Sequence, residues 1–150
     1  MLFALITICA VLSSVNAACK STILFSATMD EEKSIAVGET VKFTNVITNI
    51  GDGYDSATGV FTAPREGYYV FHFYGLTGYG QRINLSLYQN EIPRVMAYGY
   101  SSYHVVGGNA VGLKLKQADR VYVKCLMEVS TLHNTGERHF ATFTGYLVGQ

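Results

Sequence analysis

The sequence predicts an all-β protein built from antiparallel strands, arranged as a sandwich or a barrel. Three observations support this fold class. Short segments rich in β-branched and aromatic residues recur along the chain, clusters of Gly and Asn separate them, and no segment holds a helical period over three turns. Short strands at regular spacing with frequent turns are typical of antiparallel sandwiches and barrels.

The first segment of the chain is not expected to be part of the fold. Residues 1–17 carry no charged side chain, and Val15 and Ala17 stand at the positions that a signal peptidase reads. A membrane-spanning helix needs about 20 apolar residues, which this run does not reach. We therefore expect a secretory signal peptide over 1–17 and a secreted, extracellular mature protein. This reading is favoured over a buried N-terminal helix and over a lipoprotein anchored through Cys19.

A short N-terminal segment, 18–24, is expected to precede a single globular domain over 25–150. The first strand begins near Phe25. The later strands share a high content of β-branched and aromatic residues and cover 40–48, 68–76, 82–88, 110–115, 120–129 and 140–148. Turns rich in Gly and Asn lie at 49–53, 78–80, 107–109 and 134–136. A domain of this length can bury a sizeable core.

Two cysteines follow the predicted signal peptide, Cys19 and Cys125. They are too few for a disulfide-dense scaffold, so the hydrophobic core must carry the stability. Cys125 shares an alternating strand face with Val121 and Val123, which favours a buried free thiol. For Cys19 three possibilities stay open: a bridge to Cys125, a bridge to another subunit, or a free thiol.

The charge balance and the motifs argue against several classes of function. With 11 basic and 11 acidic residues and no basic run, binding to nucleic acid or to a membrane surface is not expected. The chain has no nucleophile elbow, no phosphate-binding Gly loop before a helix and no His-Glu-x-x-His motif. His133 and His139 lie six residues apart, with only Glu137 as an acidic partner at metal-ligand spacing. We therefore expect no enzyme, no cofactor and no metal site.

Both faces of the expected strand at 68–74 are apolar. Alternate side chains point to opposite sides of a strand, and a half-solvated strand is normally polar on one side. The two faces are Tyr69, Phe71 and Phe73 on one side, and Tyr68, Val70, His72 and Tyr74 on the other. The first set can fill the core. We expect the second set to form the interface of a symmetric oligomer, because a large exposed apolar stripe usually marks an interface.

Residues 43–73 hold aromatic, Asn and Gly residues at fixed spacing. The eight positions are Phe43, Asn49, Tyr54, Phe61, Gly67, Tyr69, Phe71 and Phe73. This spacing resembles the signature of the complement C1q globular-head family. Segments 87–90, 108–115, 119–122 and 143–147 are similar to later blocks of that family in the same order. The aromatics of the signature are expected in the core and its glycines in turns, so the signature identifies a fold and does not contain the binding site.

The resemblance implies a jelly-roll β-sandwich, shared with the tumour necrosis factor family, and a compact homotrimer. Family members are secreted recognition modules that bind immune complexes, microbial sugars and lipopolysaccharide, receptors or synaptic proteins, and they are not enzymes. Some relatives bind calcium through Asp residues in the segment that corresponds to 96–106. Here no Asp or Glu occurs between Glu91 and Asp119, which disfavours calcium. Ala118 stands where the family usually has Gly, so the turn before Asp119 can differ.

Ligand-binding residues are expected in loops, which carry function on a rigid sandwich. Four aromatic residues could stack against a sugar ring, and two basic residues in the late loop could meet anionic groups. They are Tyr98, Tyr100, Tyr103 and His104, and Arg138 and His139, respectively. The alternative for the tyrosines is that they fill the trimer interface.

Asn84 begins an N-glycosylation sequon, Asn84-Leu85-Ser86. Alternation with Ile83 and Leu85 predicts that its side chain points outward from the strand. A glycan on Asn84 is therefore expected to be feasible.

Two functions remain. The first is a lectin-like pattern-recognition protein of innate immunity that binds microbial surface glycans or lipopolysaccharide. The alternative is an extracellular signalling, adaptor or matrix protein, similar to cerebellin, that binds a host protein. A glycan-binding screen would distinguish the two.

Overall fold

The computed structural model describes residues 22–135 and 138–149, which form twelve β-strands and no helix. No helix able to cross a membrane therefore occurs in these residues. The predicted signal peptide and Cys19 lie outside the described residues. In chain order the strands are β1 (Leu24–Thr28), β2 (Lys33–Ile35), β3 (Asn45–Ile50), β4 (Tyr54–Asp55), β5 (Val60–Thr62), β6 (Gly67–Leu76), β7 (Arg82–Gln89), β8 (Ile92–Tyr100), β9 (Val106–Leu115), β10 (Arg120–Cys125), β11 (Ser130–Leu132) and β12 (Thr142–Gly149).

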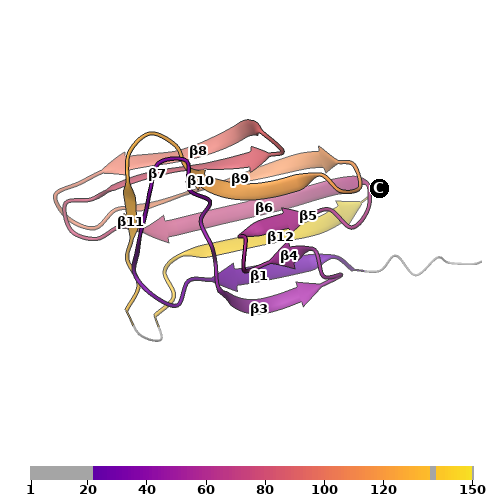
Figure 1. The fold of residues 1–150 in the computed structure, drawn as a ribbon, viewed down its shortest axis with the longest axis horizontal. Helices are drawn as coiled ribbons and strands as arrows, with labels where there is room; N and C mark the ends of the chain where they lie inside the picture. Colours follow the sequence, from indigo (N-terminus) through magenta and orange to yellow (C-terminus); the bar gives the residue numbers. More distant parts are fainter. Residues whose placement is uncertain (1–21, 136–137, 150) are drawn as a thin grey trace, which may run out of the picture.

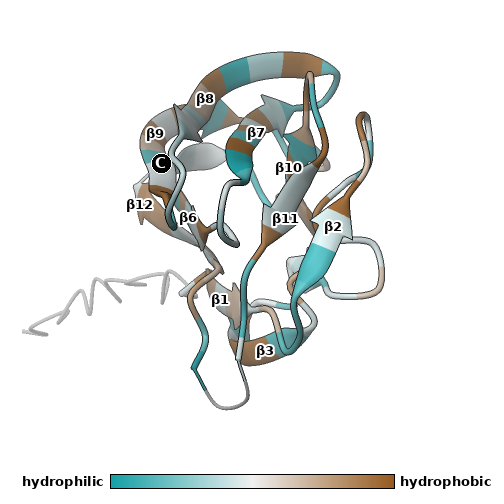
Figure 2. Cartoon of the chain, turned by 90° about the vertical axis from the view of Figure 1, so that its left-hand side faces the viewer, coloured by the Kyte–Doolittle hydropathy of each residue, from teal (hydrophilic) through white to brown (hydrophobic). Residues whose placement is uncertain are grey.

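Two five-stranded antiparallel sheets make up the body of the molecule (Figure 1). We call them sheet I, with the order β3-β1-β12-β6-β9, and sheet II, with the order β4-β5-β10-β7-β8. The short strands β11 and β2 pair separately and lie side by side in Figure 2, with β11 near the left end of the molecule in Figure 1. Most neighbouring strands are distant in the sequence, and the first and last strands, β1 and β12, lie side by side. This is the jelly-roll β-sandwich that the sequence predicts.

Aromatic rings build the core between the sheets. The ring centre of Phe25 lies 4.7 Å from that of Tyr54, 5.1 Å from that of Phe61 and 4.8 Å from that of Phe143. Five residues of the 43–73 signature have no exposed surface, namely Phe43, Phe61, Tyr69, Phe71 and Phe73. Burying each such side chain contributes about 2 kcal/mol to folding, so these rings dominate the stability of the sandwich.

The polar residues of the same segment close a turn. The Asn49 side chain donates to the Tyr54 carbonyl oxygen over 2.8 Å and accepts from the Tyr54 N–H over 3.1 Å. The buried Tyr54 hydroxyl donates to the carbonyl oxygen of Phe43 over 3.1 Å, and burial raises the pKa of Tyr54. Gly59 has a φ of +76°, and a Cβ there would stand 2.3 Å from the Val41 carbonyl oxygen. Only glycine fits this close approach.

Several strand bounds differ from the prediction. The strand expected over 40–48 begins only at Asn45, and the one expected over 120–129 ends at Cys125. The edge strand β8 was not predicted. It contains Pro93, which an edge strand tolerates because one side of it needs no ladder hydrogen bonds. Cys125 itself is buried and free, as predicted, and its thiol donates to the Glu128 carbonyl oxygen over 2.7 Å.

Asn84 points outward from its strand, as predicted, but the expectation that this leaves it open to a glycan is wrong, because its side chain is fully buried. Residues 126–129 leave β10 and cross the outer side of β7, so the chain itself covers Asn84. With its amide oriented to satisfy both contacts, the Asn84 side-chain oxygen accepts from the main-chain N–H groups of Met127 over 3.1 Å and Glu128 over 3.0 Å. A glycan on the Asn84 nitrogen has no room in this packing.

The turn before β10 contains the departure from the family pattern. Ala118 has a φ of 70°, in the left-handed region that glycine prefers. The Asp119 carboxylate accepts from the Asn90 side chain over 3.1 Å and from the Lys116 N–H over 2.9 Å. These hydrogen bonds hold the pKa of Asp119 below its usual value. The turn thus keeps a glycine-like backbone although it carries an alanine.

Candidate ligand-binding site

Three loops bring aromatic side chains together at one end of the sandwich, the left end in Figure 1, which faces the viewer in Figure 2. The loops are 77–81 between β6 and β7, 101–105 between β8 and β9, and the segment between β11 and β12. We call the five side chains the loop-end cluster. They are Tyr79, Tyr103, His104, His133 and Phe140.

The rings of the loop-end cluster form a continuous chain of contacts. The centre of the His104 ring lies 4.5 Å from that of Tyr79 and 4.9 Å from that of His133. Tyr79 in turn contacts Tyr103 at 5.9 Å, and His133 stacks on Phe140 at 6.0 Å. Tyr79 and Tyr103 are 66% and 67% exposed, so the outer end of the cluster is open to a ligand.

A pocket of about 400 Å³ lies beside these rings. Its wall includes Tyr79, His104 and His133 from the cluster, together with the side chains of Glu32 and Gln81. It therefore combines aromatic faces with a carboxylate, an amide and two imidazoles. Ligand sites commonly have this composition, in which rings supply contact area and a few polar groups fix the orientation.

Thr77 connects the loops below the pocket. It is fully buried, and its main-chain N–H donates to the Val105 carbonyl oxygen over 2.9 Å while its hydroxyl accepts from the Val105 N–H over 3.0 Å. The carbonyl oxygen of Thr77 lies 2.5 Å from Nδ1 of His104. Thr77 also forms an isolated antiparallel β-bridge with Leu132. On the other side, Nδ1 of His133 lies 2.5 Å from the Glu32 carboxylate. Both imidazoles are thus held in place by hydrogen bonds.

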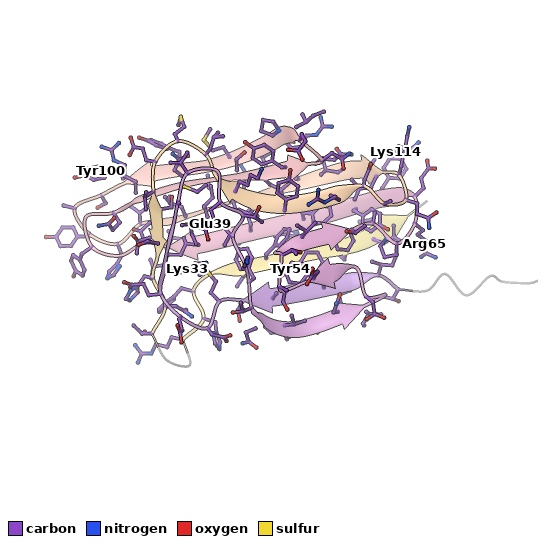
Figure 3. All side chains as sticks on the ribbon, viewed as in Figure 1. Lys33, Glu39, Tyr54, Arg65, Tyr100 and Lys114 are labelled. Carbon is purple, nitrogen blue, oxygen red and sulfur yellow. The ribbon has the colours of Figure 1, made fainter. Side chains whose placement is uncertain are left out.

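The six predicted ligand residues lie in three places. Tyr103 and His104 belong to the loop-end cluster. Tyr98 and Tyr100 lie on the outer side of the edge strand β8, where they are 57% and 60% exposed. Figure 3 labels Tyr100. The Arg82 guanidinium stands 5.0 Å from the Tyr100 ring. The two residues of the late loop, Arg138 and His139, are exposed, and Nδ1 of His139 lies 3.0 Å from the Met29 carbonyl oxygen.

Three members of the cluster were missed from the sequence: Tyr79, His133 and Phe140. The exposure of Tyr79 could have been predicted from the sequence, because the neighbouring Gly78 and Gly80 form a turn and have no side chains that could bury its ring. His133 and Phe140 had none. His133 reaches the cluster through the pairing of the distant strands β11 and β2 and the bridge from Thr77 to Leu132, which only tertiary structure establishes.

The outer face of sheet I is a second candidate surface. Tyr68 and Tyr74 on β6 are 53% and 43% exposed there, and Val70 and His72 between them are half-buried. Opposite Val70, His72 and Tyr74 the residues on β9 are small, whereas Lys114 lies opposite Tyr68. A Cβ at Gly108, the partner of Tyr74, would stand 2.1 Å from the Tyr74 ring. The His72 ring stacks on Tyr146 of β12, with the ring centres 6.0 Å apart. The face is accordingly flat, aromatic and almost free of charge near its centre.

The fold has known relatives. The structure of the globular domain of zebrafish complement 1qA superposes with a TM-score of 0.71 and 22% identity, covering 86% of this chain and 98% of that one. The tumour necrosis factor Eiger of S. frugiperda superposes with a TM-score of 0.72 and 11% identity, covering 87% of this chain and 95% of that one. At these identities the likeness concerns the fold alone.

The sequence comparisons identify the family. One of the subunits of the human complement C1q subcomponent is 29% identical over 129 residues, which cover 84% of this chain and 50% of that protein. The chain therefore spans about half the length of this curated relative. The model of the C1q domain matches residues 24–148, which is nearly the whole of the described chain. The protein accordingly belongs to the C1q domain family.

Proposed function

We propose that this protein is a secreted, non-enzymatic recognition module of innate immunity that binds microbial surface glycans, including lipopolysaccharide, at the loop-end cluster. The observation that carries the proposal is the pocket of about 400 Å³ whose wall joins exposed aromatic rings to hydrogen-bonding side chains. Membership of the C1q domain family supports a role in binding, and its homologues are secreted proteins.

The chemistry of the pocket suits a carbohydrate. Tyr79 presents an exposed ring on which the apolar face of a sugar can stack. Glu32, Gln81 and the imidazoles offer both donors and acceptors for hydroxyl groups. Such mixed polarity matches a sugar better than an extended apolar ligand.

The module is proposed to act as a homotrimer through the outer face of sheet I. Tyr68, Val70, His72 and Tyr74 form an aromatic stripe that no segment of the described chain covers. Trimer formation would bury this stripe and would also present three copies of the loop-end cluster. Several weak sites on one particle raise the avidity for a repetitive surface such as a bacterial envelope.

The second candidate function, binding of a host extracellular protein, is supported by a different surface. Met96, Tyr98 and Tyr100 on β8 lie exposed, and so do Met127 and Val129 in the adjoining loop. Aromatic residues and Met are enriched in the centres of protein–protein interfaces. This surface fits a protein partner better than it fits a sugar.

A pair of double variants tests the two candidates. Tyr79→Ala with Tyr103→Ala removes the exposed rings of the loop-end cluster, and Tyr98→Ala with Tyr100→Ala removes two equally exposed rings elsewhere. On a glycan and lipopolysaccharide array, we expect the first pair to lose about 10-fold or more in binding and the second to match the wild type, since a stacked ring contributes on the order of 1 kcal/mol or more. If neither wild type nor variants bind any glycan, the first proposal is wrong. Binding to a host protein that only the second pair abolishes would favour the alternative.

A further inference from the structure

We infer that His104 and His133 form a binding site for a divalent transition-metal ion such as Zn²⁺, which they would ligate through their Nε2 atoms at the edge of the loop-end pocket. No sequence motif points to this site. His104 and His133 are separated by 28 intervening residues and match no metal-ligand spacing.

The partner of each ring determines that its Nδ1 carries a proton. Nδ1 of His104 lies 2.5 Å from the Thr77 carbonyl oxygen, and Nδ1 of His133 lies 2.5 Å from a Glu32 carboxylate oxygen. A carbonyl oxygen and an ionised carboxylate can only accept, so each Nδ1 carries the proton. In the neutral ring, Nε2 then holds a free lone pair. Among the described residues neither Nε2 has a hydrogen-bond partner.

This arrangement is the one that metal-ligating histidines adopt. Such a histidine almost always donates its second ring N–H to a carboxylate or a backbone carbonyl, which orients the ring and raises its basicity. Here His133 has the carboxylate and His104 has the carbonyl. The Thr77 acceptor is fully buried, whereas Glu32 lies in the loop before β2 and its side chain is 50% exposed.

The spacing of the rings also fits a shared ion. Zn–N bonds are about 2.0 Å long, so two imidazoles bound through Nε2 to one tetrahedral ion have ring centres about 5 Å apart. The centres of His104 and His133 are 4.9 Å apart, and their planes are inclined by 41°. The His133 side chain is 24% exposed and both rings line the pocket, so an ion can enter from solvent.

The coordination would be incomplete with protein ligands alone. In residues 22–135 and 138–149, no three or more His, Cys, Asp or Glu side chains are grouped to hold one metal ion. Two imidazoles therefore leave at least two positions for water or for oxygen atoms of a ligand in the pocket. Imidazole nitrogen favours Zn²⁺, Ni²⁺ or Cu²⁺ over Ca²⁺, which prefers several oxygen ligands.

Zinc titration of the untagged protein tests the site. We expect saturable binding of one Zn²⁺ per chain by calorimetry. His104→Gln and His133→Gln should each weaken it by at least about 10-fold, and Glu32→Ala, which removes the acceptor for His133, by about 10-fold. His139→Gln, an exposed histidine outside the loop-end cluster, is the matched control and should bind as the wild type does. No saturable binding by the wild type, or equal binding by the wild type and the His104→Gln/His133→Gln double variant, would overturn the inference.

A second measurement uses the wild-type protein, so it does not depend on whether a variant folds. The ring ¹⁵N resonances of the metal-free protein at alkaline pH report the tautomer of each histidine. We expect His104 and His133 to carry the proton on Nδ1, and we expect Zn²⁺ to shift the resonance of Nε2 in these two rings. Protons on Nε2 in both rings would contradict the geometry on which the site rests. Because neither experiment contains a glycan, both outcomes are independent of the proposed sugar binding.

Discussion

The two faces of β6 carry aromatic side chains of the same kind in different surroundings. On the inner face Tyr69, Phe71 and Phe73 have no exposed surface, whereas on the outer face Tyr68 and Tyr74 are 53% and 43% exposed. The inner rings contact the aromatic side chains of the core, among them Phe61 of sheet II. Composition therefore does not distinguish the buried face of this strand from its exposed face. What separates them is whether the chain itself supplies a second layer.

The largest expected effect tests the inner face. Phe71→Ala removes a ring that lies 5.4 Å from Phe61 and 6.2 Å from Phe143, and it should lower the free energy of unfolding by about 3–5 kcal/mol. Its neighbour His72 points to the outer face, so His72→Ala should cost the single chain less than about 1 kcal/mol. Urea unfolding at concentrations where the protein is monomeric measures both. Similar losses for the two variants would remove the distinction between the faces.

The next effect tests the outer face. Val70→Asp places a carboxylate at the centre of the stripe, and an unpaired buried charge costs about 3–5 kcal/mol, so the dissociation constant of the proposed trimer should rise by about 100-fold or more. Light scattering should then give the monomer mass while the far-ultraviolet circular dichroism stays unchanged.

Val37→Asp is the control for this experiment, because Val37 is 54% exposed in the loop after β2, away from the stripe. It should leave the oligomer intact. A monomeric wild type, or a Val70→Asp variant that keeps the mass of an oligomeric wild type, would show that the proposed trimer through the outer face of sheet I is wrong.

A smaller effect is expected on β7, where the chain covers Asn84. Asn84→Ala leaves the N–H groups of Met127 and Glu128 without their acceptor, and an unsatisfied buried group costs about 1–3 kcal/mol. The melting temperature should fall accordingly. The protein secreted from eukaryotic cells should also show no change in intact mass after treatment with a peptide-N-glycosidase. A mass loss located at Asn84 would show that the packing of residues 126–129 over β7 is wrong.

The smallest expected effect tests the backbone conformation of one residue, and burial plays no part in it. Ala118 has a φ of 70°, so Ala118→Gly should relieve strain and raise the stability by up to about 1 kcal/mol. Ala57→Gly, at an exposed turn position that does not have a positive φ, should be neutral or slightly destabilising. Thermal unfolding of the two variants makes the comparison. A loss of stability for Ala118→Gly equal to that of Ala57→Gly would speak against the left-handed turn.

The fold class and the composition of the core could be predicted from local sequence patterns. Alternation along the strands is a local property, and it predicted an antiparallel sandwich or barrel with Phe71 and Phe73 on its inner face, while the jelly roll was implied by the family resemblance of the segment from Phe43 to Phe73. The free, buried Cys125 followed from the same alternation.

Tertiary contacts decide instead whether a strand face is covered by another segment and which loops lie together in the loop-end cluster. Alternation states that Asn84 points away from Ile83 and Leu85, but it does not state that residues 126–129 lie over it. His104 and His133 meet because Thr77, directly after β6, forms a β-bridge with Leu132 on β11. Such contacts between distant segments leave no periodic signal in a single sequence. The candidate site therefore depends on pairings between distant segments, whereas the core depends on the local pattern of each strand.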